Sequence, residues 1–170
     1  MASFSESDTD GLDFRLMQNG AITLYFQRAV LEADLAWLRD RGYRIETIDC
    51  REPETLRDQL SEALRFNENY GHDWNGNLNA LNDGFGDVAI DPRGGTVFCF
   101  LRYDLVQTSE PSVAHAILDI IESNSRFHLL FGRRLLALVQ SDDPRIQFEP
   151  LGARPAQWNR NEWLDRNRGL

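Results

Sequence analysis

Two runs of almost uninterrupted apolar residues, at positions 96–101 and 135–139, limit the folds that this chain can adopt. Neither run alternates with polar residues, so each is typical of a strand that is covered on both faces. Between them, from Pro111 to Gly132, apolar residues recur at helical spacing. A buried strand, a helix and a second buried strand predict parallel strands with helices packed on the sheet.

The first third of the chain has the same strand-and-helix order. Residues 21–26 and 43–50 are rich in β-forming side chains, and each run is predicted to be a strand. Between these runs, apolar residues at helical spacing stop at Gly42, a residue type that commonly ends helices. Pro53 then marks the start of another predicted helix. The order from residue 43 to residue 140 is therefore β–α–α–β–α–β.

Other segments are predicted to be less regular. Residues 1–13 are acidic and have little to bury, so we expect a frayed tail. Residues 104–110 are predicted to be a loop. In the long helix, Phe127 and Phe131 continue the apolar face that is expected to point inward. Near the C-terminus, Asn159 and Glu162 have the spacing of a capping box, which predicts a short helix.

Composition narrows the class of protein. The chain has 170 residues and a net charge of −9, and all eighteen of its basic residues are arginine. Such an acidic protein is a poor partner for nucleic acid or for an anionic membrane surface. No apolar run approaches the ~18 residues that a membrane span needs. The only two cysteines, Cys50 and Cys99, lie in apolar stretches and are expected to be buried thiols, which fits a reducing cytoplasm.

Residues 67–87 form the most unusual stretch of the chain. Six of the sixteen residues from 67 to 82 are asparagine, which favours turns, so the first half is predicted to be a loop. A short helix is predicted to follow, with Asn77 as its N-cap. Its inward stripe consists of Leu78, Leu81, Phe85 and Val88.

The opposite side of this short helix carries Asn79 and Asp83, which are four residues apart and therefore share a face. From residue 66 to residue 92 there are five acidic residues and no basic one. Ordinary surfaces mix both signs of charge. A single-sign block of this length favours a docking surface for a cationic partner.

The residues of this stretch also resemble a known family. Tyr70-Gly71, the sequence Asn-Leu-Asn-Ala-Leu at 77–81 and Asp83 are similar to the Tyr-Gly-(Glu)-Asn-Leu-Asp-Ala-Leu-(Trp)-Asp segment of barstar-family proteins, the intracellular inhibitors of barnase-type ribonucleases. Residues 72–76 stand where the family usually has one residue. Asn79 replaces the first helix aspartate of the family, and Asn82 replaces its Trp.

The resemblance implies an α/β fold of the barstar type, in which a small parallel three-stranded sheet is packed with helices over residues 43–141. Residues 1–42 are then an N-terminal extension that contains the tail, a strand and a helix. Residues 142–170 are a C-terminal extension. Both extensions are expected to pack on the core, because their tryptophans and leucines are costly to leave in water.

The resemblance also implies a function. It points to an inhibitor of the immunity or antitoxin type that blocks the cationic active site of a basic ribonuclease with its acidic, Asn-rich loop and helix. Asp83 would take the place of the substrate phosphate, and the loop aromatics would supply rigid contact area. The partner-binding residues that we expect are Tyr70, Gly71, Trp74, Asn77, Asn79, Asn82 and Asp83.

Two other classes of function stay open. The changed loop and the loss of charge at Asn79 favour a barstar-fold binding module whose partner is not a nuclease. Catalysis is the least favoured, because His72, His115 and His128 are too scattered in sequence to share a metal or an acid–base role. We therefore expect no catalytic residue, no metal, no cofactor and no small-molecule substrate.

Overall fold

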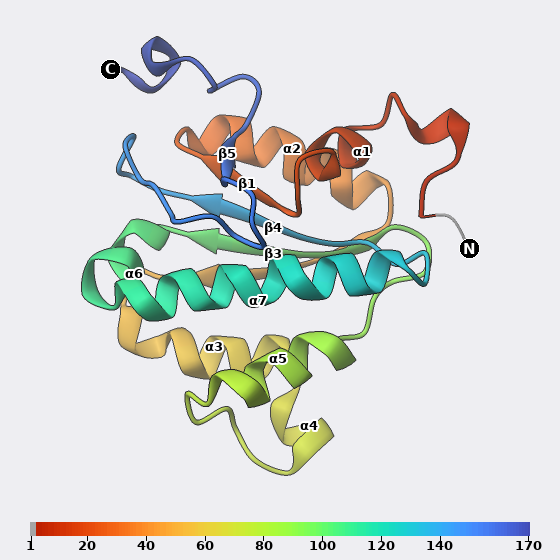
Figure 1. Cartoon of the computed structure of the whole chain (residues 1–170), viewed down its shortest axis with the longest axis vertical. Coiled ribbons are helices and arrows are strands. Elements are labelled where there is room, and N and C mark those ends of the chain that lie inside the picture. Colours follow the sequence, from red (N-terminus) through yellow and green to blue (C-terminus); the bar gives the residue numbers. More distant parts are fainter. Residues whose placement is uncertain (1–2) are drawn as a thin grey trace.

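A computed structural model describes residues 3–170 and contains a five-stranded parallel sheet with the strand order β2-β3-β4-β1-β5 (Figure 1). The strands are β1 (Ile22–Tyr25), β2 (Tyr43–Asp49), β3 (Gly95–Leu101), β4 (Leu135–Gln140) and β5 (Gln157–Trp158). The α-helices are α1 (Leu12–Met17), α2 (Arg28–Asp40), α3 (Leu56–Ala63), α4 (Phe66–Tyr70), α5 (Leu78–Asp87), α6 (Tyr103–Ser109) and α7 (Pro111–Leu129). Short 3-10 helices occupy Glu6–Asp8, Pro53–Thr55 and Asp165–Arg168.

The central strands confirm the predicted α/β class. β3 pairs in parallel with β2 along its whole length, from Tyr43 opposite Gly95 to Asp49 opposite Leu101. On its other side β3 pairs with β4, and all six residues of β4 are buried. The N-terminal strand β1 then pairs with β4, and the two-residue strand β5 pairs with β1. The three-stranded sheet is thus extended by one strand from each flank of the chain.

The two faces of the sheet are covered by different helices. On one face, Leu31, Leu35 and Leu38 of α2 pack with Val97 of β3 and Leu138 of β4. The other face is covered by α3, α5, α6 and α7, which contribute to a larger core (Figure 1). In the view of Figure 1, α4 and α5 lie at one end of the long axis, whereas β5 and the C-terminal segment lie at the other end.

The segment predicted to be a loop at residues 104–110 is largely helical, since α6 spans Tyr103–Ser109. Tyr103 and Val106 lie one turn apart and are buried in the larger core. The Tyr103 hydroxyl donates a hydrogen bond of 2.8 Å to the backbone oxygen of Ala114. The prediction of a loop was wrong because two apolar positions are too few to show a helical period in the sequence.

The end of α7 also differs from the prediction. Phe127 and Phe131 do not point inward, because their exposed fractions are 50% and 56%. The buried positions of this part of α7 are polar instead: Ser125 Oγ donates to the Leu135 backbone oxygen at 2.7 Å, and His128 Nε2 lies 2.9 Å from the Phe85 backbone oxygen. A buried polar residue that is hydrogen-bonded can occupy a core position, and a count of apolar residues does not detect it.

The predicted frayed tail is largely ordered. Residues 1–2 lie outside the described residues, but the chain from Ser3 onward packs against the domain. Asp13 of α1 is buried, and its Oδ2 accepts hydrogen bonds from the Tyr43 hydroxyl at 2.7 Å and from Arg134 Nη1 at 2.9 Å. Both partners belong to the central strands or lie beside them, so they hold the extension in place.

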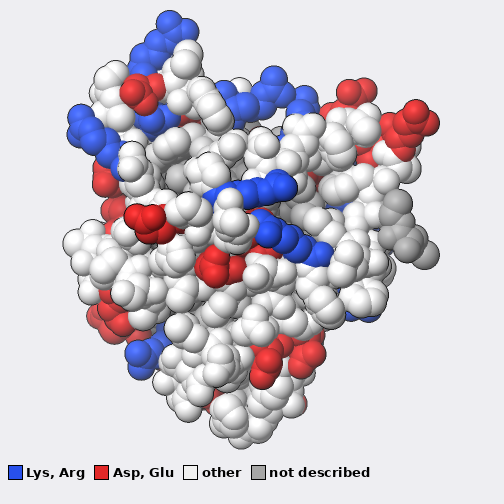
Figure 2. All heavy atoms as spheres, in the orientation of Figure 1, with Lys and Arg blue, Asp and Glu red and all other residues white. Residues whose placement is uncertain are grey.

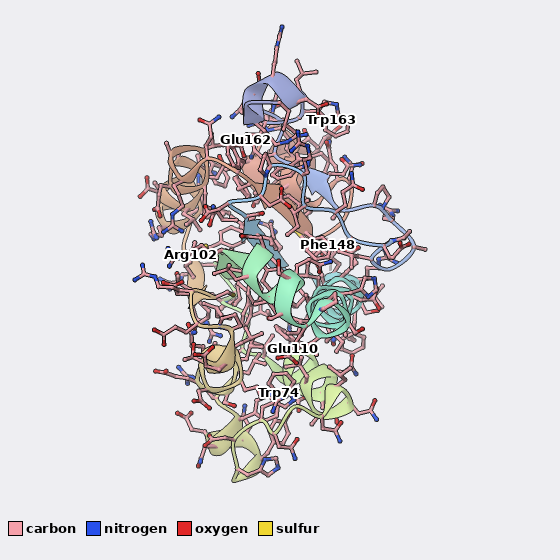
Figure 3. The ribbon with its side chains drawn as sticks, turned by 90° about the vertical axis from the view of Figure 1, so that its left-hand side faces the viewer. Trp74, Arg102, Glu110, Phe148, Glu162 and Trp163 are labelled. Carbon is pink, nitrogen blue, oxygen red and sulfur yellow. The ribbon has the colours of Figure 1, made fainter. Side chains whose placement is uncertain are left out.

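The predicted capping box at Asn159 and Glu162 is wrong, because no helix starts there. Glu162 is fully buried, and its two carboxylate oxygens accept hydrogen bonds from the backbone N–H groups of Phe26 (2.9 Å) and Gln27 (2.6 Å). These N–H groups immediately precede α2, where a carboxylate is favoured by the helix dipole. Trp163 follows with an exposed fraction of 57%, and both Glu162 and Trp163 lie at the end of the molecule opposite to Trp74 (Figure 3).

Two further observations bear on the sequence predictions. Cys50 and Cys99 are buried free thiols, and burial raises the pKa of each to about 12. Among residues 3–170, no helix combines the length and the apolar character that crossing a bilayer requires.

Candidate functional site

Helix α5 starts where the sequence predicts. Asn77 is its N-cap, and the Asn77 side-chain oxygen accepts hydrogen bonds from the backbone N–H groups of Asn79 (2.9 Å) and Ala80 (3.3 Å). Leu81 and Phe85 are completely buried. Leu78, predicted to lie on the same stripe, is 39% exposed, because the first turn of α5 projects beyond the core.

The two glycines in the second half of α5 allow close packing. A Cβ atom added at Gly84 would lie 2.7 Å from the ring of Phe66, which is closer than real contacts allow. A Cβ atom at Gly86 would lie 3.4 Å from the side-chain oxygen of Asn124 on α7. These small residues allow α5 to pack closely against α4 and α7. The face of α5 opposite to these glycines therefore points toward solvent.

The outward face of α5 carries Asn79, Asp83 and Asp87 at successive intervals of four residues, and all three are exposed. Among residues 3–170, no cation forms an ion pair with Asp83. Figure 2 shows acidic atoms over α5 on this side of the molecule, without basic atoms next to them. Asn82 is also exposed, but its side-chain oxygen accepts a hydrogen bond of 3.0 Å from Asn124 Nδ2.

Tyr70 lies beside this face, at the end of α4. The segment from Phe66 to Tyr70 is a short helix rather than the predicted loop, because Phe66 is buried and anchors it. The Tyr70 hydroxyl donates a hydrogen bond of 2.8 Å to Asp87 Oδ2. Desolvation, together with this carboxylate, raises the pKa of Tyr70 to about 12. Gly71 then ends α4 with a φ of 77°, a conformation that favours glycine.

Trp74 does not belong to the exposed site. It is only 4% exposed, and its indole N–H donates a hydrogen bond of 2.7 Å to the Asn77 backbone oxygen. Its backbone N–H donates to Ser61 Oγ at 2.8 Å. The loop that was predicted to offer Trp74 to a partner instead folds around it. Burying a large aromatic ring is favourable, and this gain exceeds the cost of ordering the polar loop around it. The prediction that Trp74 contacts a partner was therefore wrong.

The charge around the loop is less uniform than the sequence indicates. The guanidinium of Arg57 on α3 lies near Gly76, where an added Cβ atom would be 3.1 Å from the central guanidinium carbon. Arg65 lies 3.8 Å from Glu68. Arg57 of α3 therefore reaches the end of the loop, and Arg65, which precedes α4, reaches Glu68. On α5 itself, Asp83 and Asp87 have no ion-pair partner among residues 3–170.

Six of the seven predicted partner-binding residues surround this face: Tyr70, Gly71, Asn77, Asn79, Asn82 and Asp83. Sequence reasoning missed Asp87, which extends the carboxylate row and fixes Tyr70. Asp87 is four residues from Asp83 and therefore on the same face of the helix, and this spacing could have identified it from the sequence. A projecting helix face with two carboxylates is suited to binding cations, and the described side chains place no nucleophile and base together on it.

Comparison with known proteins identifies the family of this chain. The family described as Barstar (barnase inhibitor) matches residues 41–140, more than half of the chain. No curated protein matches the sequence. The family match spans β2, β3, β4 and the helices between them, including α5, and leaves both extensions outside. Barstar proteins are protein inhibitors rather than enzymes. This chain belongs to the barstar family.

Proposed function

We propose that this protein inhibits a ribonuclease by placing the outward face of α5 in the cationic active site of the enzyme. The observation that carries the proposal is the state of Asp83: it is exposed, lacks an ion-pair partner among residues 3–170, and stands in line with Asp87 on a rigidly packed helix. Membership of an inhibitor family supports it.

The physical basis is imitation of charge. A ribonuclease must present Arg, Lys or His side chains to the phosphate of RNA, and a carboxylate can occupy the same place. Asp83 would take the phosphate position, with Asp87 one turn away. The amides of Asn79, Asn77 and Asn82 would lie at the rim. Gly71 has open space on its Cβ side, so a partner could approach the backbone there.

The test compares Asp83→Ala with Asp40→Ala in the inhibition of a barnase-type ribonuclease. Asp40 is exposed at the end of α2, on the opposite face of the sheet, so its removal changes net charge without touching α5. Truncating one member of a buried charge pair costs about 2–5 kcal/mol, a range drawn from complexes that include barnase with barstar. We expect a loss of that size for Asp83→Ala and little change for Asp40→Ala.

Association should also slow as salt is raised, because the acidic face would steer the encounter. Equal inhibition by the wild type and by Asp83→Ala would show that this face is not the docking surface. The ribonuclease to examine first is one encoded beside this protein, since an inhibitor of the immunity type is made together with its toxin.

A second candidate is a binding module of the same fold with a partner that is not a nuclease. It is favoured by the loop of residues 72–76 and by Asn82, which is bonded to Asn124 where the family carries a tryptophan. Recovery of a basic nuclease in a pull-down from cell lysate would support inhibition. Recovery of an acidic or neutral partner in its place would support the second candidate.

A further inference from the structure

A cavity of about 360 Å³ lies at the end of the molecule opposite to α5. It is lined by two segments, residues 12–23 and residues 157–163, which come from the N-terminal and C-terminal extensions. None of its lining residues lies within the part of the chain that matches the barstar family. Its size falls within the roughly 300–1,000 Å³ typical of small-molecule sites. The function of the family therefore does not account for this cavity.

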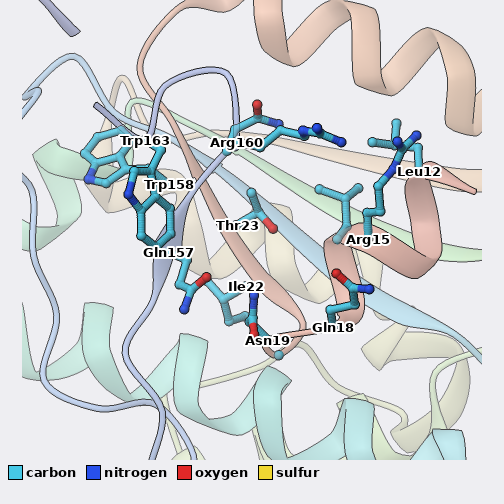
Figure 4. A pocket seen from close by; sticks show the side chains of 13 residues that line it. Leu12, Arg15, Gln18, Asn19, Ile22, Thr23, Gln157, Trp158, Arg160 and Trp163 are labelled. Atoms are coloured by element: carbon cyan, nitrogen blue, oxygen red, sulfur yellow. The ribbon is translucent and has the colours of Figure 1, made fainter. Parts of the chain in front are cut away.

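The cavity is lined in its middle by a polar side chain. Thr23 of β1 is only 6% exposed and lines the cavity, and its side chain lies in the middle of the site in Figure 4. The Thr23 hydroxyl is not one of the fully enclosed polar atoms that lack a partner. A ligand in the cavity would therefore replace water as the hydrogen-bond partner of this hydroxyl.

Two arginines also line the cavity. Arg15 lines the cavity from α1, and Arg160 extends from the C-terminal segment toward that side (Figure 4). Neither guanidinium forms an ion pair with another residue of the described chain. The charge of Arg15 acts on Asp34, whose Oδ2 already accepts hydrogen bonds from the Tyr25 hydroxyl and Asn159 Nδ2. Two unpaired cations at a cavity of an acidic protein favour an anionic ligand.

Aromatic rings line the remaining side. Arg168 lies over the ring of Trp158 at 4.4 Å and holds this side chain in place. Trp163 lines the same cavity but leaves more than half of its surface in water. Exposing a tryptophan to this extent is costly, and a planar ring stacked on it would remove that cost. The ligand that satisfies both halves of the cavity carries an anionic group and an aromatic ring.

We propose that this cavity binds a mononucleotide. The phosphate lies between Arg15 and Arg160, the Thr23 hydroxyl bonds to the phosphate or the ribose, and the base stacks on Trp163. This site is separate from the face of α5, so occupancy of the cavity and inhibition of a ribonuclease are independent properties of the protein.

Calorimetric titration of the full chain with AMP, GMP, CMP and UMP tests the proposal. We expect at least one mononucleotide to bind at least tenfold more tightly than both its nucleoside and inorganic phosphate, because each of these lacks one half of the ligand. Absence of saturable heat with all four nucleotides at millimolar concentration would overturn the proposal. Equal affinity for inorganic phosphate would also overturn it, since the ring would then contribute nothing.

Variants locate the site. Arg15→Gln and Arg160→Gln change exposed side chains and should each weaken nucleotide binding about tenfold or more. Trp163→Ala should weaken it as well. Arg133→Gln is the matched control, because Arg133 is exposed and remote from the cavity, and it should leave affinity unchanged. Undiminished binding by both cavity arginine variants would contradict the assignment. Inhibition of a ribonuclease should be the same for Arg15→Gln and the wild type.

Discussion

The hydroxyl of Tyr70 is hydrogen-bonded to the carboxylate of Asp87, and this contact joins the end of α4 to the last residue of α5. The chain between them passes through Gly71, Trp74 and Asn77, which turn it around a buried indole ring. The loop is therefore fixed at both of its ends and at its centre. A face held in this way loses little conformational entropy when it binds a partner.

The Tyr70–Asp87 contact predicts the titration of Tyr70. Its pKa is raised to about 12 from 10.0, first by desolvation and then by Asp87. Asp87→Asn removes the charge and should bring the pKa down toward 10. Because the folded-state pKa is the higher one, this group destabilises the fold only as pH rises through the range from 10 to 12. The ultraviolet absorbance of ionised tyrosine measures the shift, and Tyr70→Phe identifies the titration step.

The comparison is Asp83→Asn, which should lower the pKa of Tyr70 less, since Asp83 acts on Tyr70 only through its charge, without a hydrogen bond. An unchanged titration in Asp87→Asn would contradict the contact.

Trp74 is predicted to matter for stability rather than for direct binding. Trp74→Ala removes a buried indole ring and should lower the free energy of unfolding by about 3–5 kcal/mol. Asp73→Ala, one residue away, removes an exposed side chain and should change it by no more than about 0.5 kcal/mol. Denaturant unfolding of both variants checks this. Similar stabilities for the two would show that Trp74 is not a core residue.

Glu162 is predicted to tie the C-terminal segment to the sheet. Glu162→Ala leaves the N–H groups of Phe26 and Gln27 without their partner and should cost about 2 kcal/mol or more. Glu149→Ala is the control, because Glu149 is exposed in the same C-terminal region. Thermal unfolding is the measurement, and a neutral Glu162→Ala would mean that water can replace the carboxylate.

Deletion of residues 1–42 tests whether the extensions form one cooperative unit with residues 43–141. The deletion removes β1 and α2, so β4 loses a neighbouring strand and the apolar side chains of Val97, Leu136 and Leu138 lose their cover. We expect the truncated chain to bind a hydrophobic dye, to associate and to melt at a lower temperature. If the truncated chain is monomeric and melts at the same temperature as the full chain, the N-terminal strand and helix are not part of the cooperative unit.

The elements that were predicted correctly are those whose own residues carry a clear local pattern. The runs at 96–101 and 135–139 are strands because nearly every residue is apolar, and α5 starts at Asn77 because its side chain caps the helix. Both signals are local, so neighbouring residues are enough to reveal them. The family match then confirmed the fold that these elements imply.

The features that were not predicted depend on contacts between residues that are far apart in the sequence. The burial of Trp74 requires Ser61 of α3, and the buried polar end of α7 requires Leu135 and Phe85 as hydrogen-bond partners. β5 has only two residues and exists because β1 lies beside it. In the candidate site, the exposed positions of α5 followed from its period, whereas the role of Asp87 depended on where Tyr70 comes to lie.

The buried carboxylate of Glu162 has a consequence for what this sheet can recognise. β1 and β4 are neighbours in the sheet, but the chain continues from them in different directions. After β1 it enters α2, which packs on one face of the sheet, and after β4 it reaches Ile146, which is buried in the core on the other face. In open parallel sheets, substrates and coenzymes usually settle in the crevice that such a divergence creates. Here the protein's own C-terminal segment fills it. Glu162 therefore occupies the position where such sheets usually bind a ligand, and the surfaces left for other molecules are the helices and the outer flank of the sheet.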